Sequence, residues 1–478
     1  MTTIRVPAVS AEFAAADLGD GRLTRRLTRI AEAAAASPSA GFPTMTQSDG
    51  ELEGVYRFLG NSRVTPRTIL APHIAATQER VADATIIIAH DTTELGFGGL
   101  MQREGLGLVG TANTRQGFFA HFALAVSADD SRTPLGVVGL KTFIRDHKRS
   151  TRPKKERDRD PDASESRKWT EIALEAHRAF PNAIHVMDRE ADSFTVLSRL
   201  VEANARFVIR LCRDKRLQDS GDLLFRTAEL RGQLRATRSV PLSRRRPHSS
   251  TTHRRQHPPR SERLATLEIK TAAVSIPRPK RPRYATGYPP HLDVKIVTVQ
   301  EVDAPADEVP LCWRLVTTEP IDTPQQVEAI VDAYRARWRI EEFFKALKTG
   351  CAFEKRQLES LRTLVNALAM FSVIAWRLML LRSVARAAPA CPATDVLTRE
   401  QVDLLSRIAK MRDPALPQLN MPGNATAHDA LIAVARLGGH IKNNGPPGWI
   451  VLGRGYDKLL LLVLGYRAAL ASTHTSEM

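Results

Sequence analysis

Two apolar runs that each end on an aspartate constrain the fold of this chain more than any other feature. Residues 84–91 read ATIIIAHD and residues 183–188 read AIHVMD. Short apolar runs of this kind predict buried strands. Asp91 and Asp188 would then lie at strand ends, where two neighbouring strands can place hard oxygen ligands around Mg²⁺. The alternative is that each aspartate only opens a turn or caps a helix.

Length and charge limit the class of protein. A chain of 478 residues indicates about three domains, at about 150 residues each. Hydrophobic residues make up 43% and charged residues 25%, which is typical of globular proteins. The net charge of +17 makes nucleic acid the first partner to consider. The alternative is that a GC-rich genome has enriched arginine for reasons unrelated to binding.

Cysteine usage and hydropathy indicate a cytoplasmic protein. The four cysteines never form a CxxC pair, so neither a disulfide framework nor a zinc site is predicted. No secretory signal is expected at the N-terminus. The apolar run Leu364–Trp376 is too short to cross a bilayer and predicts a buried helix, so no membrane partner is expected.

The remaining pattern indicates several domains. Helices are expected at 10–80, 169–180, 324–347 and, apart from a break at 445–448, beyond 359. Further strands are expected at 118–127, 134–143, 206–210, 264–274, 292–299 and 313–318. The charged stretch 148–167 predicts an exposed loop, and the Arg-, Pro- and Ser-rich stretch 241–262 predicts a mobile loop that touches DNA or solvent.

Basic residues in the N-terminal region recur at helical spacing. Arg22, Arg25, Arg26 and Arg29 share one helix face, with few acidic residues nearby. An ordinary solvated face is one interpretation, and contact with DNA phosphates is the sharper one.

The predicted helix after Pro324 presents a mixed polar stripe. Tyr334, Arg337, Glu341 and Lys348 are spaced by three, four and seven residues, as in one face of an α-helix. Glu341 would bind a metal ion, and the guanidinium of Arg337 and the ammonium of Lys348 would hold phosphate oxygens. The spacing alone also fits an amphipathic helix with ordinary ion pairs.

The pattern Tyr-x2-Arg-x3-Glu-x6-Lys resembles the Y-R-E-K signature of bacterial insertion-sequence transposases of the Asp-Asp-Glu class. The residues WRIEEFFKALKTG at 338–350 resemble the subgroup that includes the transposase of a composite kanamycin-resistance transposon. The likeness extends to DTT at 91–93 and DREAD at 188–192, which are similar to the two aspartate motifs of the family. LGD at 18–20 and VYRF at 55–58 resemble its N-terminal DNA-binding module.

The resemblance implies a multidomain α/β fold with a ribonuclease H-like catalytic core and a β-rich insertion. It implies a helical DNA-binding domain at 1–75, a catalytic domain at 76–215 and 311–385, the insertion with its basic loop at 216–310, and a helical dimerisation domain at 386–478. Residues 448 onward resemble the dimerisation region loosely. The partners implied are double-stranded DNA, as transposon ends and as target, and a second copy of the chain.

The resemblance also implies roles for individual residues. Asp91, Asp188 and Glu341 would bind two Mg²⁺ ions, for which Mn²⁺ would substitute, and cut DNA through a hairpin intermediate before strand transfer. Trp313 corresponds to a residue on which a flipped base stacks, although a core tryptophan is the alternative. Further DNA phosphate contacts would come from Tyr334, Arg337, Lys345, Lys348 and Arg210.

Two other functions stay open. A related metal nuclease would cut DNA without joining it. A domesticated or inactive relative would bind DNA as a repressor, but such proteins commonly lose a member of the acidic triad.

Overall fold

The computed structural model divides the chain into two compact units. The described residues are 6–82, 84–99, 102–110, 115–145, 165–218, 220–247, 251, 254, 258–280, 284, 286–411, 421–441 and 445–475. The first unit contains Met1–Ala84, Thr92–Asp146 and Trp338–Met478, and the second contains Thr85–Asp91 and His147–Arg337. The domain limits expected from the sequence stay a prediction.

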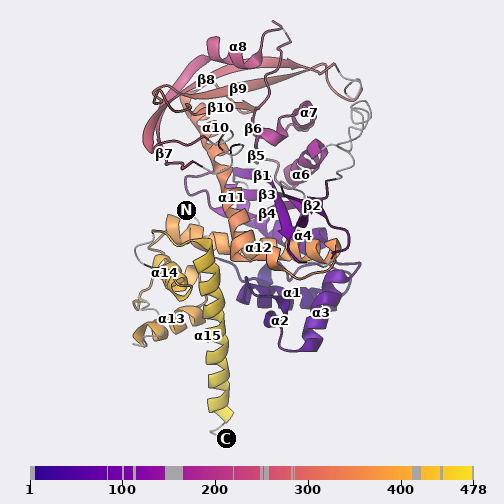
Figure 1. Cartoon of the computed structure of the whole chain (residues 1–478), viewed down its shortest axis with the longest axis vertical. Helices are drawn as coiled ribbons and strands as arrows, with labels where there is room; N and C mark the ends of the chain where they lie inside the picture. Colours follow the sequence, from indigo (N-terminus) through magenta and orange to yellow (C-terminus); the bar gives the residue numbers. More distant parts are fainter. Residues whose placement is uncertain are drawn as a thin grey trace. The chain divides into compact units, whose positions relative to one another are not determined.

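A mixed sheet organises the second unit. Its strand order is β1-β5-β6-β10-β9-β8-β7. The first three strands pair in parallel and the others are antiparallel, and β7, β8 and β9 lie side by side in Figure 1. The strands are β1 (Ile86–Phe97, its first half), β5 (Ile184–Met187), β6 (Arg206–Arg210), β7 (Gln233–Leu242), β8 (Arg263–Pro277), β9 (His291–Glu301) and β10 (Cys312–Thr317).

Helices cover this sheet through apolar side chains. They are α6 (Glu165–Ala179), α7 (Phe194–Glu202), α8 (Leu224–Leu230) and α10 (Pro324–Ala336), with a 3-10 turn η4 (Arg189–Ala191) after β5. Trp169 on α6 and Phe194 on α7 join Phe207 and Ile209 of β6 in one buried cluster. Burial of such aromatic and aliphatic side chains supplies the main force that holds these layers together.

The β-rich stretch between Asp188 and Glu341 is present, and one of its strands escaped prediction. β7 includes Pro241 and Leu242, which the sequence assigned to a mobile loop. Arg245 also forms an isolated bridge with Arg260, so the described ends of that stretch are paired. Residues 248–250, 252–253 and 255–257 of the stretch lie outside the described residues, as do residues 146–164, which cover most of the predicted loop at 148–167.

The first unit combines a small sheet with many helices. Its strands are the second half of β1, β2 (Gly107–Val109), β3 (Arg115–Ser127) and β4 (Pro134–Phe143). The N-terminal helical elements are η1 (Ser10–Glu12), α1 (Gly21–Ala36), α2 (Phe42–Met45), α3 (Asp49–Gly60) and α4 (Pro66–Val81). The C-terminal ones are α11 (Trp338–Lys345), η6 (Ala346–Gly350), η7 (Phe353–Lys355), α12 (Leu361–Ala387), η8 (Ala393–Asp395), α13 (Arg399–Lys410), α14 (Ala427–Leu437) and α15 (Trp449–Thr475).

The long apolar helix α12 is buried within the first unit, and the sequence predicted a buried helix here. Among the described residues it is the one helix long and apolar enough to cross a membrane, but 89% of its most apolar stretch is buried inside the protein. Two buried side chains of this helix, Asn366 and Trp376, donate hydrogen bonds to backbone carbonyls. The Asn366 amide donates to the carbonyls of Leu59 and Val64 (2.8 and 3.0 Å), and Trp376 Nε1 donates to the carbonyl of Pro134 (3.0 Å).

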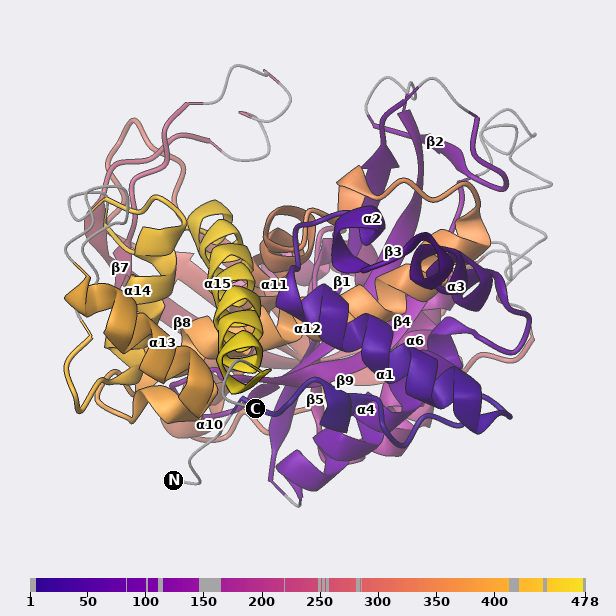
Figure 2. The same ribbon diagram turned by 90° about the horizontal axis from the view of Figure 1, so that it is seen from below.

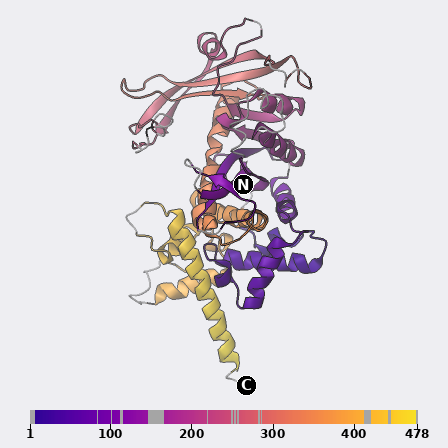
Figure 3. The ribbon, with the colours of Figure 1, turned by 45° about the vertical axis from the view of Figure 1, so that its right-hand side comes forward.

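The C-terminal helices pack closely where glycines allow it. Figure 2 shows α13, α14 and α15 side by side, and Figure 3 shows that α15 extends beyond its two neighbours. A Cβ atom on Gly455 would lie 1.7 Å from the carbonyl oxygen of Val434, so α15 can approach α14 only because glycine has no side chain.

Two expectations about the elements around the acidic residues are wrong. Asp91 does not end its strand, because β1 continues to Phe97. The helix expected at 324–347 is not regular: α10 ends at Ala336, α11 begins at Trp338, and η6 is a π-helical turn in which the Cys351 amide donates to the Ala346 carbonyl. Lys348 lies in this wider turn, so the four signature residues do not share one continuous α-helical stripe.

Candidate active site and nucleic-acid interface

The two aspartates of the second unit come from adjacent parallel strands. The register pairs Ile88 with His185 and Ala89 with Val186. When this register is continued by two residues along both strands, Asp91 lies opposite Asp188. Side chains alternate between faces along a strand, and neighbouring strands are about 4.8 Å apart. The two carboxylates therefore share one face of the sheet.

Asp91 is held by an arginine of the signature. Arg337 Nη1 lies 2.6 Å from Asp91 Oδ2, and the side chains are only 15% and 13% exposed. The backbone at Arg337 remains helical, with φ −50° and ψ −33°. Limited solvent makes such a pair stronger than one on the open surface. The ion pair therefore fixes the position of the Asp91 carboxylate and orients the Arg337 guanidinium beside it.

Asp188 ends β5 and starts the η4 turn. Its Oδ1 accepts a hydrogen bond from the Glu190 amide at 2.8 Å, so the capping role that the sequence left open is present. This hydrogen bond uses only Oδ1, so Oδ2 of the Asp188 carboxylate can accept from or bind another partner. Two carboxylates on one sheet face are a donor set that fits a hard divalent cation. Among the described residues, no group of three or more His, Cys, Asp or Glu side chains has metal-site geometry.

A buried acid that sequence reasoning missed stabilises the turn after Asp188. Asp192 Oδ2 accepts from the amides of Cys212 and Arg213 (2.8 and 2.9 Å), and Oδ1 pairs with the ammonium of Lys215. These contacts tie η4 to the segment after β6. The spacing Asp188-x3-Asp192 was visible in the sequence. The pairing of Asp192 with Lys215 was not predictable, because the two residues are far apart in the chain.

Trp313 and Tyr334 lie together in the second unit. Trp313 is on β10, as expected, and its half-buried ring packs edge-on against Tyr334, with ring centroids 5.2 Å apart. Tyr334 is 6% exposed. Arg210 ends β6, opposite Leu315 of β10, and its Nη2 donates to the Cys312 carbonyl at 3.4 Å.

Glu341 and Lys348 belong to the first unit. Glu341 is in the first turn of α11, whose Phe343 and Phe344 pack against Phe122 of β3, as the predicted apolar face requires. Burial lowers the pKa of Lys348, and the nearby carboxylates of Glu354, Glu94 and Glu341 oppose that shift. Lys348 and Glu341 are therefore electrostatic neighbours.

Two further side chains of α11 face solvent. Trp338 is 58% exposed, although it directly follows Arg337 in the chain. Lys345 Nζ lies 5.9 Å from the centre of the Trp338 ring, which is a cation–π distance. An exposed tryptophan beside a lysine is a surface suited to nucleic acid, and sequence reasoning did not single out Trp338.

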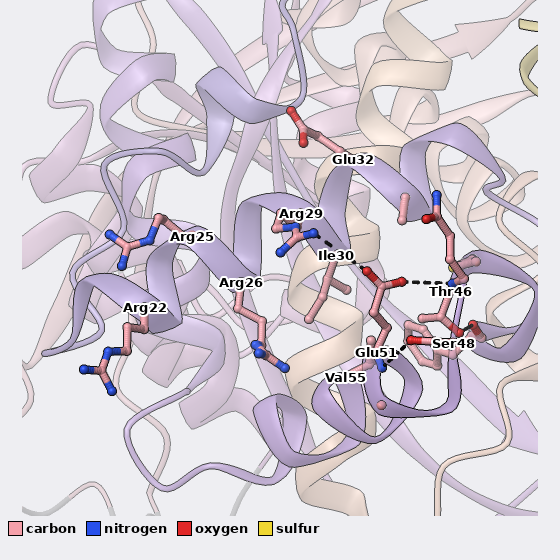
Figure 4. A pocket seen from close by; sticks show the side chains of 15 residues that line it. Arg22, Arg25, Arg26, Arg29, Ile30, Glu32, Thr46, Ser48, Glu51 and Val55 are labelled. Atoms are coloured by element: carbon pink, nitrogen blue, oxygen red, sulfur yellow. Dashed lines mark hydrogen bonds and ion pairs between the residues drawn. The ribbon is translucent and has the colours of Figure 1, made fainter. Parts of the chain in front are cut away.

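The four N-terminal arginines line one pocket of about 740 Å³. They project from α1 along one wall, and the opposite wall comes from α2 and the start of α3 (Figure 4). Asp20 caps α1 by accepting from the Arg22 amide at 2.8 Å, which fixes where the basic face begins. Arg29 has an acidic partner, Glu51, at 3.7 Å. The pocket gathers four guanidinium groups, a type of side chain that commonly contacts DNA phosphates.

Two family models match the chain. Residues 6–64 match the model described as transposase DNA-binding. Residues 80–378, more than half of the chain, match the model described as transposase DDE domain. The first match contains the arginine-lined pocket, and the second contains both aspartates, Trp313 and all four signature residues.

Proposed function

The chain belongs to the transposase DDE domain family and is a DNA transposase with a DNA-binding domain, and from this premise we propose that Asp91, Asp188 and Glu341 are its catalytic triad. The observation that carries the proposal is the shared sheet face of Asp91 and Asp188 on adjacent parallel strands. Glu341 follows Arg337, the partner of Asp91, by four residues of helical sequence. We propose that these residues lie in a ribonuclease H-like core, with the domain limits predicted above.

Domains of this family generally use divalent metal ions, and two Mg²⁺ ions (or Mn²⁺) supply an activated nucleophile and charge stabilisation for the leaving oxygen. Asp91, Asp188 and Glu341 would hold these ions. Arg337, Lys348, Lys345 and Arg210 would bind phosphate oxygens of the DNA strand. Tyr334 would donate its hydroxyl to another phosphate oxygen, and its ring packs against Trp313.

The reaction begins when water attacks a phosphodiester at the transposon end and releases a 3′-hydroxyl. That hydroxyl attacks the opposite strand, and the displaced oxygen leaves, so a hairpin closes the end. Hydrolysis of the hairpin restores the 3′-hydroxyl, which then joins to target DNA. Each step exchanges one P–O bond for another, so no covalent enzyme intermediate is needed.

Hairpin formation requires a sharp bend, and Trp313 would offset part of the unstacking cost by stacking on a flipped base. The N-terminal pocket would bind the inverted repeats, and two copies of the chain would pair two ends through the C-terminal helices. Exposed leucines on the described part of α15, Leu461 and Leu464, support that pairing. A DNA-bound protein of this kind acts in the cytoplasm, at the nucleoid.

Replacing one triad member tests the proposal. We expect Asp91→Asn, Asp188→Asn and Glu341→Gln each to lower Mg²⁺-dependent cleavage of end DNA by about a thousandfold or more, because metal ions contribute several kcal/mol to such steps. End binding in a mobility-shift assay should be unchanged. The control is Glu342→Gln, since Glu342 neighbours Glu341 but pairs with Arg339 at 2.7 Å. Cleavage by any triad variant at the wild-type rate would remove that residue from the triad.

Trp313→Ala separates the steps. We expect hairpin formation to slow by about tenfold to a hundredfold, because base stacking on an aromatic ring is worth about 1–3 kcal/mol. First-strand nicking should change little. Gel analysis of end-labelled DNA resolves both products, and an equal loss of both would contradict base stacking. A strand-transfer assay on wild-type protein distinguishes a transposase from a nuclease that only cuts and from a repressor that only binds.

A further inference from the structure

Two buried histidines connect the strands that carry Asp91 and Asp188. His90 lies on β1 and His185 on β5, and His90 Nε2 is 2.9 Å from His185 Nδ1. Both side chains are 0% exposed. Their ring centroids are 5.2 Å apart. Since side chains alternate along each strand, the histidines occupy the sheet face opposite to the two aspartates.

A third histidine packs against the pair. His177 of α6 packs edge-on against His185, with centroids 5.9 Å apart. Burial, followed by the neighbouring His90 and His177, lowers the pKa of His185 well below its ordinary value. A neutral imidazole has one donor and one acceptor nitrogen, so His185 can form one hydrogen bond with His90 through Nδ1.

The hydrogen bond between the two rings can form in one strand register only. A slip of one residue between β1 and β5 would move Asp188 by about 3.3 Å along the sheet and turn its side chain to the other face. Apolar neighbours tolerate small shifts, whereas separating two buried hydrogen-bonding groups leaves each of them desolvated without a partner. A single buried polar contact is known to fix register in coiled coils by the same principle.

We propose that the His90–His185 hydrogen bond is a positioning device that fixes the separation of the Asp91 and Asp188 carboxylates for metal binding. The inference rests on the proposed metal site. Neither histidine touches the reacting atoms. They act through the backbone of β1 and β5, as supporting residues do behind other metal ligands.

Mn²⁺ binding to the full-length protein, measured by calorimetry without DNA, tests the inference. In His90→Leu/His185→Leu the apolar pair keeps the core filled but removes the hydrogen bond between the two strands. We expect thermal stability to be equal or higher, because replacing both buried polar partners by apolar groups is often neutral or stabilising. Mn²⁺ affinity should nevertheless fall by about tenfold, which is typical of lost supporting contacts.

Two variants guard against a general effect. His185→Asn places an amide group near the position of Nδ1 and should keep wild-type affinity. His177→Leu removes the third histidine but leaves the hydrogen bond, and should also keep it. Unchanged Mn²⁺ affinity in the double variant, or an equal loss in His177→Leu, would overturn the inference. If Asp91→Asn binds Mn²⁺ as tightly as wild type, the proposed metal site fails instead.

Discussion

His121, on β3, shows how burial of one side chain couples stability to pH. Its ring is 0% exposed, and Nδ1 lies 2.9 Å from Thr92 Oγ1. Desolvation lowers its pKa from 6.5 to about 3. Between these values the unfolded chain binds a proton that the folded chain does not, so the unfolded state gains stability as the pH falls.

We therefore expect the free energy of unfolding to decrease below pH 6.5, with His121 contributing about 1.4 kcal/mol per pH unit. His121→Asn keeps an acceptor for Thr92 but cannot titrate, so its stability should depend on pH less steeply by that amount. Urea unfolding at about pH 7, 6 and 5 measures both slopes. Parallel curves for the two proteins would exclude His121 as the titrating group.

For single residues, the positions of the two aspartates could be predicted from the sequence, but the residues that contact and position them could not. Asp91 and Trp313 lie on the strands that their local patterns predicted, and Asp188 directly follows its strand. Their partners were not predictable, because the contacts join residues far apart in the chain. Arg337 pairs with a residue 246 positions away, and His90 with one 95 positions away.

Elements with strong periodic signals were predicted better than their ends. The apolar strands and α12 are present, whereas β1 continues past Asp91 because Leu95 and Phe97 are also buried. The π-helical turn at Ala346–Gly350 has no propensity signal. It depends on tertiary contacts, including the approach of Gly453 to the Gly350 carbonyl, where an added Cβ would lie 2.9 Å away.

Two glycines of α15, Gly455 and Gly465, allow a controlled test of how closely this helix packs against α14. Gly455→Ala should lower thermal stability, because the new methyl group would overlap the Val434 carbonyl of α14 and force the helices apart. We expect a loss of about 1–3 kcal/mol. Gly465 has no atom within 4 Å of an added Cβ, so Gly465→Ala should instead gain up to about 1 kcal/mol from helix propensity. Equal effects at both positions would show that α14 and α15 do not pack as described.

For the whole molecule, the net charge of +17 predicts DNA binding that weakens steeply with salt. Arg25→Ala removes one guanidinium from the N-terminal pocket and should lower the slope of log affinity against log salt by about one unit. Arg57→Ala makes the same change in net charge, but Arg57 pairs with Glu53 and does not line the pocket. Filter binding at several salt concentrations should leave its slope unchanged. Equal slopes for both variants would mean that overall charge, and not the pocket, binds the ends.

Helix α12 has a consequence for folding during synthesis of the chain. Its 27 residues leave the ribosome as one of the most apolar segments of the nascent protein. Most of the elements that bury it, among them α3, α4 and β4, precede it in the chain and have already been synthesised. The helix can therefore pack against these elements as it leaves the ribosome, before α13, α14 and α15 have been synthesised. Translation order thus gives this apolar segment partners to pack against as soon as it is synthesised.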